Sequence, residues 1–519
     1  MKSLYNVSTL SEKNLTLTEA FMFEKNIKKK VNKQLKKNFP KWRRLPKKEK
    51  KIIAKQVLEA VVADYDFSQL LDINDKGLFG VEGQAPAEGM MTLEEMAQFI
   101  ERHNFSNIIR LCDVKRSACN ITNEELRFID KMLDNKVLTS LITSDSYSPQ
   151  MRDYYPIQFF RAELLKAIKY PEISYRKYCT EEYLGIDRKE NREFIGLPLH
   201  KKTIIDHTQL CQFRRNLTFI QQVNLMVYIL HYFNQSGRLG DCMLHGIDST
   251  ELANDCNYPL ASVTVNGKKI RIYSDIDCDC GKRRNKRDKS TYVVGYRLHT
   301  LTAIDAKTGH SFPLISLLAP ANHHDSRFLS FLVELSQCIG IDVKLISADE
   351  AYHDNDGSLY QNTGVLVSTP PSSTVKLPEH VNSETGAVFI DEECATPMVH
   401  IGFSEQMHEY KCAAQDGECD RQATCPLYRD IPLDRGYFQQ IPYATENIKE
   451  VHEIRKNIER PFNLLKNQVG MEQVRVRSQH STLTRCTISN IAILLIEMAG
   501  KRRKQKKHRA KQLDLPKAA

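Results

Sequence analysis

The hydrophobic pattern of this chain changes at about residue 241, and this change most limits the fold that the chain can adopt. Before it, apolar residues recur at helical spacing over 50–66, 123–142, 156–169 and 219–234, and Thr92 to Glu95 form a capping box that predicts the start of another helix. After it, a buried strand over 242–252, a β-hairpin over 297–319, a helix capped by Asp325 and an apolar strand ending at Asp349 are expected. Strand, hairpin, helix and strand in this order predict an α/β fold preceded by a helical region.

The length of 519 residues suits two or three domains with cores of their own. We find no apolar run near the ~18 residues that a membrane span needs, and the first residues lack the apolar segment of a secretory signal. We therefore expect a protein without membrane contact, located in the cytoplasm and associated with the nucleoid.

Positive charge is concentrated near the two ends of the chain. Residues 25–51 carry fourteen Lys or Arg against the single acid Glu49, and residues 501–512 carry eight bases and no acid, although the whole chain has a net charge of only +10. Such segments suit a polyanion, and the alternatives are a solvated tail or a localisation signal. Trp42, between Lys41 and the pair Arg43 and Arg44, favours nucleic acid because an indole ring can stack on a base.

Two aspartates, Asp248 and Asp349, are each predicted at the tip of a buried strand. A carboxylate there costs free energy unless it is paired or binds a metal, and strand tips are where ligand sites of α/β sheets gather. Two such acids on neighbouring strands could hold a divalent cation, and a third would complete a two-metal site. The alternative is that each Asp is only a turn or cap residue.

A third acid comes from a helix predicted over 451–468. The spacing of Arg455, Glu459 and Lys466 places all three on one face of a regular helix. They form either a surface ion-pair ladder or a site in which Glu459 binds metal and the two cations contact phosphates.

Four cysteines form the only cysteine cluster in the sequence, namely Cys394, Cys412, Cys419 and Cys425. Their surroundings are too polar to bury them as apolar side chains, which predicts a structural Zn²⁺ site, with free thiols as the alternative. A basic loop that includes Arg283 and Arg284 is expected to lie near nucleic acid.

Several motifs occur together in a fixed order, and over about residues 200–480 this order resembles that of the bacterial insertion-sequence transposases of the DDE type. The motifs are IDST at Asp248, GYRLH at 295–299, APANHHDSRF at 319–328, SADEAYHD at 347–354, and His452, Arg455, Glu459 and Lys466 in the spacing of a Tyr-Arg-Glu-Lys signature. His452 stands where that signature has Tyr.

The resemblance implies a ribonuclease-H-like catalytic domain, a mixed sheet flanked by helices. Within it, Asp248, Asp349 and Glu459 match the catalytic triad that binds Mg²⁺ or Mn²⁺. By the same resemblance, Arg455 and Lys466 would contact transposon-end DNA, as would His452 in place of the signature Tyr. The cysteine cluster resembles an insertion that some of these transposases carry before the catalytic Glu, and His324 and Asp325 become candidates to support the site.

The expected organisation is a basic helical segment over 1–85, a helical DNA-binding region over 86–240, the catalytic domain over 241–500 with the insertion at about 355–445, and a basic tail over 501–519. The expected function is metal-dependent cleavage at the element's ends and transfer of the 3′-hydroxyl into target double-stranded DNA, by a homodimer or larger assembly. The alternatives are a transposase-derived DNA-binding protein that does not cut, a zinc-stabilised nucleic-acid interaction module, and a plain nuclease.

Overall fold

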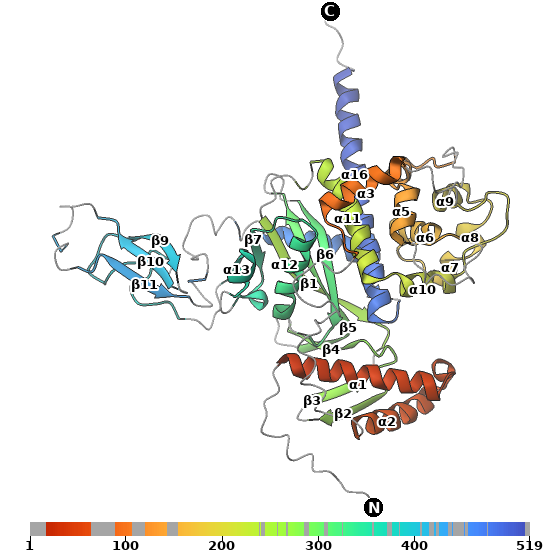
Figure 1. The fold of residues 1–519 in the computed structure, drawn as a ribbon, viewed down its shortest axis with the longest axis horizontal. Coiled ribbons are helices and arrows are strands. Elements are labelled where there is room, and N and C mark those ends of the chain that lie inside the picture. The colour runs from red at the N-terminus through yellow and green to blue at the C-terminus, as the bar shows by residue number, and fades with distance from the viewer. Residues whose placement is uncertain are drawn as a thin grey trace, which may run out of the picture.

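The computed structural model describes residues 17–63, 89–105, 120–142 and 154–513. Within the last range it omits 238, 240–243, 257, 266–267, 285–289, 306–309, 324, 355–357, 371–375, 383–384, 405–406, 415–419, 422–424, 434–437, 440–450, 452–454 and 475. Figure 1 shows a central sheet with a helical region on one side, a small helix-and-strand unit below it, and a small separate sheet on the other side.

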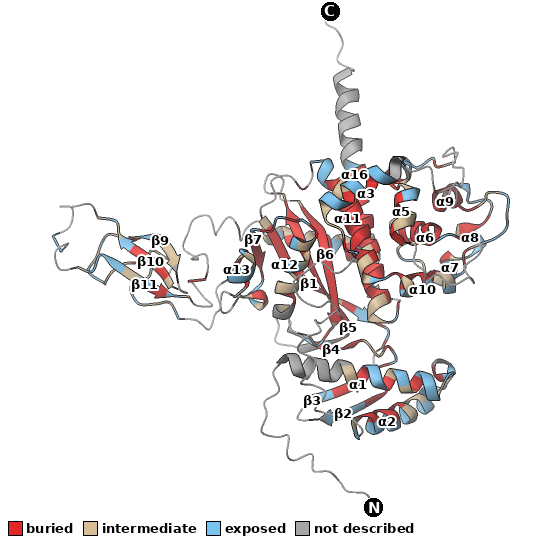
Figure 2. Cartoon of the chain, in the orientation of Figure 1, coloured by how far each residue is buried: buried red, intermediate tan, exposed pale blue. Residues whose placement is uncertain are grey.

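The central sheet is mixed, as predicted. Its strand order is β4 (Asp279–Arg284), β5 (Ser290–Ile304), β1 (Leu244–Asn254), β7 (Leu345–Ala348) and β8 (Leu366–Ser368), with β6 (Ser311–Pro320) also paired to β5 and β12 (Gln473–Val474) to β1. β1 runs antiparallel to β5 and parallel to β7. The predicted hairpin is confirmed as β5 and β6, which pair antiparallel. β6 is buried over most of its length, as Figure 2 shows for the sheet interior.

The predicted helical region is confirmed. It comprises α3 (Leu93–Phe105), α4 (Glu124–Met132), α5 (Asn135–Ile142), α6 (Pro156–Lys169), α7 (Tyr175–Tyr178), α8 (Glu181–Leu184), α9 (Lys189–Ile195), α10 (His207–Asn216) and α11 (Phe219–Gln235). The capping box at the start of α3 forms, because Thr92 Oγ1 accepts from the Glu95 N–H and the Glu95 carboxylate accepts from the Thr92 N–H.

The C-terminal helix α16 (Gln479–Leu513) joins the helical region to the sheet, since it packs against α6, α10, α11 and β6. A buried carboxylate helps to hold it there. Glu163 of α6 is ion-paired with Arg214 of α10, lies 3.9 Å from Arg485 of α16, and accepts a hydrogen bond from Tyr175 Oη at 2.7 Å. Breaking a buried pair of this kind by removing one partner typically costs about 3–5 kcal/mol.

One helix in the described part of the chain, Gln479–Gly500 of α16, is long and apolar enough to cross a bilayer, and 78% of that window is buried inside the protein. Its apolar residues therefore serve the core that α16 shares with the sheet and the helical region.

The N-terminal helices α1 (Leu17–Asn38) and α2 (Lys47–Ala63), joined by the 3₁₀ turn η2 (Trp42–Arg44), pack on the two-stranded sheet of β2 (Ala261–Val265) and β3 (Lys268–Ile272). Trp42 is only 9% exposed and belongs to this core. The prediction that its ring stacks on a base was therefore wrong, because the indole is buried between the helices and the hairpin.

Helices and turns on the remaining faces complete the region around the central sheet. They are η6 (Asp325–Phe328), α12 (Leu329–Cys338), η7 (Glu350–Tyr352), α13 (Ser358–Thr363), η8 (Lys456–Ile458), α15 (Glu459–Asn463) and the π-helical turn η9 (Leu464–Gln468). A separate three-stranded sheet of β9 (Met398–Ser404), β10 (Met407–Cys412) and β11 (Tyr428–Pro432) lies within the predicted insertion.

Three local predictions were wrong. Asp248 lies inside β1, which continues to Asn254, and does not end the strand. Asp325 begins the 3₁₀ turn η6, and the N-cap of α12 is Phe328. Of the helix expected over 451–468, the described residues 455–468 are helical, but as a succession of 3₁₀, α and π turns with Pro461 in the middle. The regular period of 3.6 residues that was expected to place Arg455, Glu459 and Lys466 on one face is therefore not present.

Candidate active site

Asp248 and Asp349 occupy equivalent positions on neighbouring parallel strands. Ile247 of β1 is paired with Ala348 of β7, and the two aspartates are the next residues along each strand. Parallel neighbours lie about 4.8 Å apart, so the register brings the two carboxyl groups to one place on the sheet. The expectation that these acids lie on adjacent strands is met.

Asp349 is held by the turn that it starts and by one cation. Its Oδ1 accepts a hydrogen bond from the Glu350 N–H at 3.0 Å, which caps η7. The same oxygen lies 3.1 Å from Nη2 of Arg455, and the two side chains are 55% and 29% exposed. Arg455 therefore comes from the far end of the sequence to the predicted pair of aspartates.

The surroundings of Asp248 change the pKa of its carboxyl group. Burial, and to a lesser degree the neighbouring carboxylates of Asp349 and Asp325, raises the pKa of Asp248 to about 6. The Ser249 N–H, which donates to Asp248 Oδ1 at 2.7 Å, and the Arg455 guanidinium oppose this rise of the pKa. A partly buried acid beside two other acids is the environment that a divalent cation would stabilise in its ionised form.

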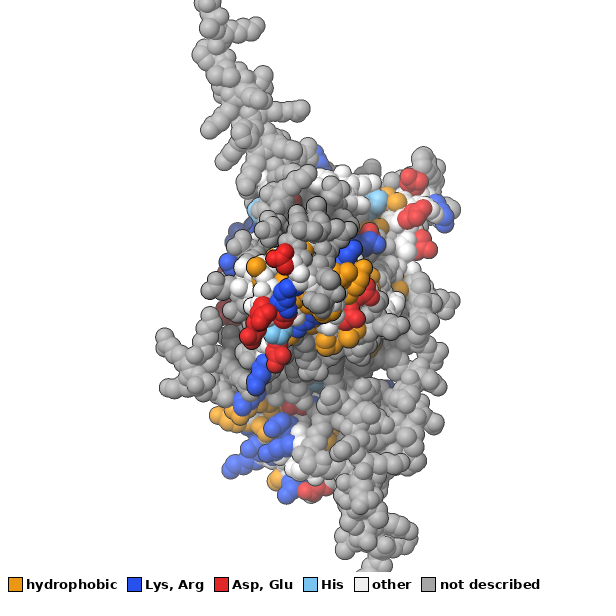
Figure 3. Space-filling view, turned by 90° about the vertical axis from the view of Figure 1, so that its left-hand side faces the viewer, with side chains coloured by type: hydrophobic (Ala, Val, Ile, Leu, Met, Phe, Trp, Pro, Cys, Tyr) orange, Lys and Arg blue, Asp and Glu red, His pale blue; other side chains and the backbone are white. Residues whose placement is uncertain are grey.

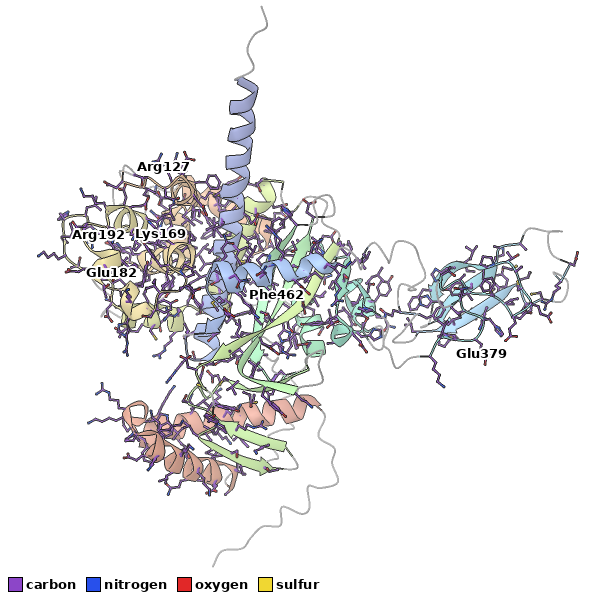
Figure 4. The ribbon with its side chains drawn as sticks, turned by 180° about the vertical axis from the view of Figure 1, so that it is seen from behind. Arg127, Lys169, Glu182, Arg192, Glu379 and Phe462 are labelled. Carbon is purple, nitrogen blue, oxygen red and sulfur yellow. The ribbon has the colours of Figure 1, made fainter. Side chains whose placement is uncertain are left out.

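Glu459 follows directly on a residue that is packed against β1. The side chain of Ile458 is buried and fills the space over Gly246, where a Cβ would come within 2.3 Å of it. Phe462 packs in the same small core, and Figure 4 shows it over the sheet. Gly246 and Asp248 face the same side of β1, because side chains alternate along a strand. The segment that carries Glu459 therefore crosses the sheet near the aspartates, and Glu459 itself is exposed.

The chemistry of these acids fits a divalent metal, since Mg²⁺ and Mn²⁺ prefer carboxylate oxygens. In the described part of the chain, however, no three His, Cys, Asp or Glu side chains gather closely enough to hold a metal ion. Arg455 instead occupies one oxygen of Asp349.

The opposite face of β1 carries a second polar network that supports the site. Arg297 of β5 binds both carboxylate oxygens of Asp325, at 2.9 and 3.1 Å, and lies 3.3 Å from Glu251. Ser249 Oγ donates to Asp325 at 3.2 Å. Asp325 thus ties β1 and β5 to η6, which is why it does not cap α12.

Beside this network, His299 holds the turn that follows Asp349. Its ring stacks on Phe328 with centroids 3.9 Å apart, and its Nδ1 lies 2.9 Å from the Oη of the buried Tyr352, the last residue of η7. Burial, Arg297 and His323 lower the pKa of His299 well below its ordinary value, so the ring is neutral and can accept from Tyr352.

The sequence motifs contained His299, in GYRLH, and named Asp325 as a candidate, but they gave no role to Glu251 or Tyr352. Glu251 could not be found because the sequence does not show the strand register, which pairs Glu251 with Arg297 across β1 and β5. His324, the other candidate from the same motif, lies outside the described residues.

Of the other residues predicted to contact DNA, the structure describes some side chains and not others. Lys466 is half-buried in η9 and Arg44 is exposed in η2. Arg43, Arg283 and Arg284 lie in η2 and β4, but their side chains are not among those described, and His452 lies outside the described residues.

Three of the four clustered cysteines are described, and a zinc site is not supported by them. Cys394, Cys412 and Cys425 are half-buried free thiols around the β9–β11 sheet, and Cys419 lies outside the described residues. Burial raises the pKa of Cys425, Arg421 opposes this, and Asp391 and the thiols of Cys394 and Cys412 raise it further. The described members of the cluster do not form a metal-binding group.

We compared the chain with solved structures, curated proteins and protein families, and the family match covers part of this site. A solved cryo-EM structure of the piggyBac transposase synaptic complex with hairpin DNA shares 11% identity with this chain over 77% of this chain and 81% of its own, at a TM-score of 0.26, which is too low to carry an argument. None of the curated proteins matches the chain. Residues 262–495 match the family described as "Transposase DDE domain", a range that includes Asp349 and Glu459 and begins just after Asp248. This match supports a DDE transposase.

Proposed function

We propose that this protein is a DNA transposase that cleaves the ends of a bacterial insertion sequence and joins the freed 3′-hydroxyl to target DNA. The observation that carries the proposal is the meeting of Asp248, Asp349 and Arg455 at one point of a mixed sheet, with Glu459 on the segment that crosses it. The match of 262–495 to the transposase DDE domain supports the same chemistry.

Asp248, Asp349 and Glu459 would hold the divalent cation, Mg²⁺ or Mn²⁺. Such a cation supplies charge neutralisation at the attacking and leaving oxygens of an in-line displacement at phosphorus. For this to happen, Arg455 has to leave Asp349, and its guanidinium is then available for a phosphate oxygen, which it can bind through two parallel hydrogen bonds.

The chain's own residues would position this reaction. Tyr352 and His299 would hold the turn after Asp349. Asp325 and Arg297 would hold β1 from the face opposite Asp248. Lys466, His452 and Arg455 would contact the DNA near the scissile phosphate, while Arg43, Arg44, Arg283 and Arg284 would contact its backbone elsewhere. We also propose that two copies act together, one on each end of the element, at the nucleoid in the cytoplasm.

A cleavage and joining assay tests this function. The substrate is a supercoiled plasmid that carries the DNA flanking the reading frame on both sides, incubated with Mg²⁺. We expect nicked and joined products with the full chain, and none with Asp248→Asn, Asp349→Asn or Glu459→Gln. Asp342→Asn, a change at a side chain that is 74% exposed, is the matched control and should keep full activity.

Two outcomes would contradict the proposal. Binding of DNA without any cutting would favour a transposase-derived binding protein, and cutting without joined strands would favour a plain nuclease. A structural zinc ion at the cysteine cluster is a separate proposal, and metal analysis of the purified protein with and without Cys394→Ser tests it: loss of one bound zinc supports it, and absence of zinc from both contradicts it.

A further inference from the structure

The N-terminal helices and the β2–β3 hairpin form one unit, although they are far apart in the sequence. Ile27, Val31, Trp42 and Leu58 from the helical side share a core with Leu260, Ala261, Ile270 and Ile272 from the hairpin side. The hairpin is thus a two-stranded ribbon with one face covered by helices. We refer to β2 and β3 together as the ribbon.

The other face of the ribbon is polar and turned to solvent. The register pairs Ser262 with Arg271 and Thr264 with Lys269, and these four side chains alternate with the buried apolar ones. Ser262, Thr264 and Lys269 are exposed, and the side chain of Arg271 is 31% exposed. Neither strand contains an acid. The outer face therefore offers two hydroxyls and the exposed cation of Lys269, while Arg271 lies beside the buried carboxylate of Asp279 in β4.

A buried ion pair fixes this unit to the catalytic sheet. Lys28 of α1 lies 2.7 Å from the fully buried carboxylate of Asp279 in β4, and Arg271 of the ribbon lies 3.8 Å from the same carboxylate. β4 pairs with β5, which in turn pairs with the strand that carries Asp248. The ribbon is therefore held in a defined position relative to the candidate active site.

The helices that cover the inner face of the ribbon are strongly basic. Among the side chains that the structure describes between residues 26 and 63, the exposed acids are Glu49 and Glu59, and the exposed cations are Lys29, Lys30, Lys33, Lys36, Lys37, Lys41, Arg44, Lys47, Lys48, Lys51 and Lys55. Figure 3 shows Lys and Arg side chains gathered over the lower part of the molecule, where this unit lies. An anionic partner therefore suits the unit that the ribbon forms with these helices.

We infer that the outer face of the ribbon binds duplex DNA, so that the ribbon is a second DNA contact beside the active site. The major groove of B-form DNA admits a two-stranded ribbon, and hydroxyl and cationic side chains suit phosphates and base edges. This inference rests on the proposed function, because it takes the DNA to be the substrate of the active site. It adds the element that holds that DNA at a fixed distance from the acids.

A gel-shift titration of the full chain tests the inference. The probes are the duplex flanking the reading frame and a random duplex of equal length, each at several salt concentrations. We expect Lys269→Glu to weaken binding about tenfold and to reduce the slope of log affinity against log salt by about 1. Lys136→Glu, a change of equal charge at an exposed position of α5, should leave affinity and slope nearly unchanged.

Two further variants separate the ribbon from its surroundings. Thr264→Ala removes a hydroxyl from an exposed position and should weaken binding about twofold or more without affecting folding. Lys55→Glu on α2 should weaken binding less than Lys269→Glu does. Equal affinities of Lys269→Glu and Lys136→Glu, or a larger loss for Lys55→Glu, would overturn the inference.

The experiments distinguish a failure of this inference from a failure of the proposed function. If the ribbon is wrong and the function right, the Lys269→Glu protein binds and nicks the plasmid like the unchanged protein. If the function is wrong, the unchanged protein does not nick the plasmid at all, whatever the gel shift gives. Asp248→Asn should bind both probes normally and fail to nick the plasmid, so that the gel shift measures binding independently of cutting.

Discussion

Replacing Asp248 by Asn should stabilise the protein at neutral pH while it abolishes cutting. The folded protein raises the pKa of Asp248 from its ordinary value of 3.8 to about 6, mainly through burial. Because a tenfold change in proton affinity is worth about 1.36 kcal/mol, this rise of the pKa corresponds to an upper limit of about 3 kcal/mol. Solvent reaches part of this half-buried side chain, so we expect a gain of about 1–3 kcal/mol.

The sign follows from proton binding. Between pH 3.8 and about 6 the folded protein holds a proton on Asp248 that the unfolded chain has released, so stability falls as the pH rises through this window. Asn cannot lose a proton, so Asp248→Asn escapes this loss. The variant should therefore gain stability over the unchanged protein between pH 4.5 and pH 7.5.

Calorimetric unfolding of the full chain at pH 4.5 and pH 7.5, with a chelator present, measures the effect. The unfolding temperature of Asp248→Asn relative to the unchanged protein should be higher at pH 7.5 than at pH 4.5. Asp342→Asn, at an exposed side chain, should show no such pH dependence. An Asp248→Asn difference that is the same at both pH values would refute the reasoning, because the carboxyl group would then not be perturbed by its burial.

Three other predictions concern the frame of the site. Arg455→Ala removes a partly exposed ion pair, so it should change the unfolding free energy by less than about 1 kcal/mol but slow plasmid nicking about tenfold or more. Gly246→Ala places a methyl group within 2.3 Å of a packed side chain, so calorimetry should show a loss of about 1–3 kcal/mol together with slower nicking. Gly500→Ala, at a helical position that meets nothing within 4 Å, should cost no stability and should leave nicking unchanged. Lys28→Ala leaves the buried Asp279 with a more distant cation and should cost about 3–5 kcal/mol, measured by chemical unfolding, and the double variant with Asp279→Leu should recover part of it. A small loss for Lys28→Ala would mean that the N-terminal unit is only loosely attached.

Local patterns in the sequence were enough to predict elements whose partners are close along the chain. The β5–β6 hairpin and the capping box at Thr92 follow from residues a few positions apart. The strand that ends before Asp349 follows from its short apolar run. In each case the neighbours that decide the structure are within the same segment.

Features that depend on distant segments could not be predicted in this way. Asp325 resembles a helix cap in the sequence, but in the structure Arg297 of β5 donates hydrogen bonds to both of its carboxylate oxygens. Trp42 looks like a stacking residue, but the ribbon supplies the other half of its core. The segment of Glu459 has helical spacing, yet Pro461 and its packing on β1 break it into turns of different period.

The central claim is that Asp248, Asp349 and Glu459 form a divalent-metal centre, and a crystal structure of the protein grown with Mn²⁺ tests it most directly. We predict an anomalous density peak between the carboxylates of Asp248 and Asp349, with Arg455 displaced from its present position on Asp349. A peak only at the cysteine cluster, or Arg455 still bound to Asp349 at saturating Mn²⁺, would contradict the account.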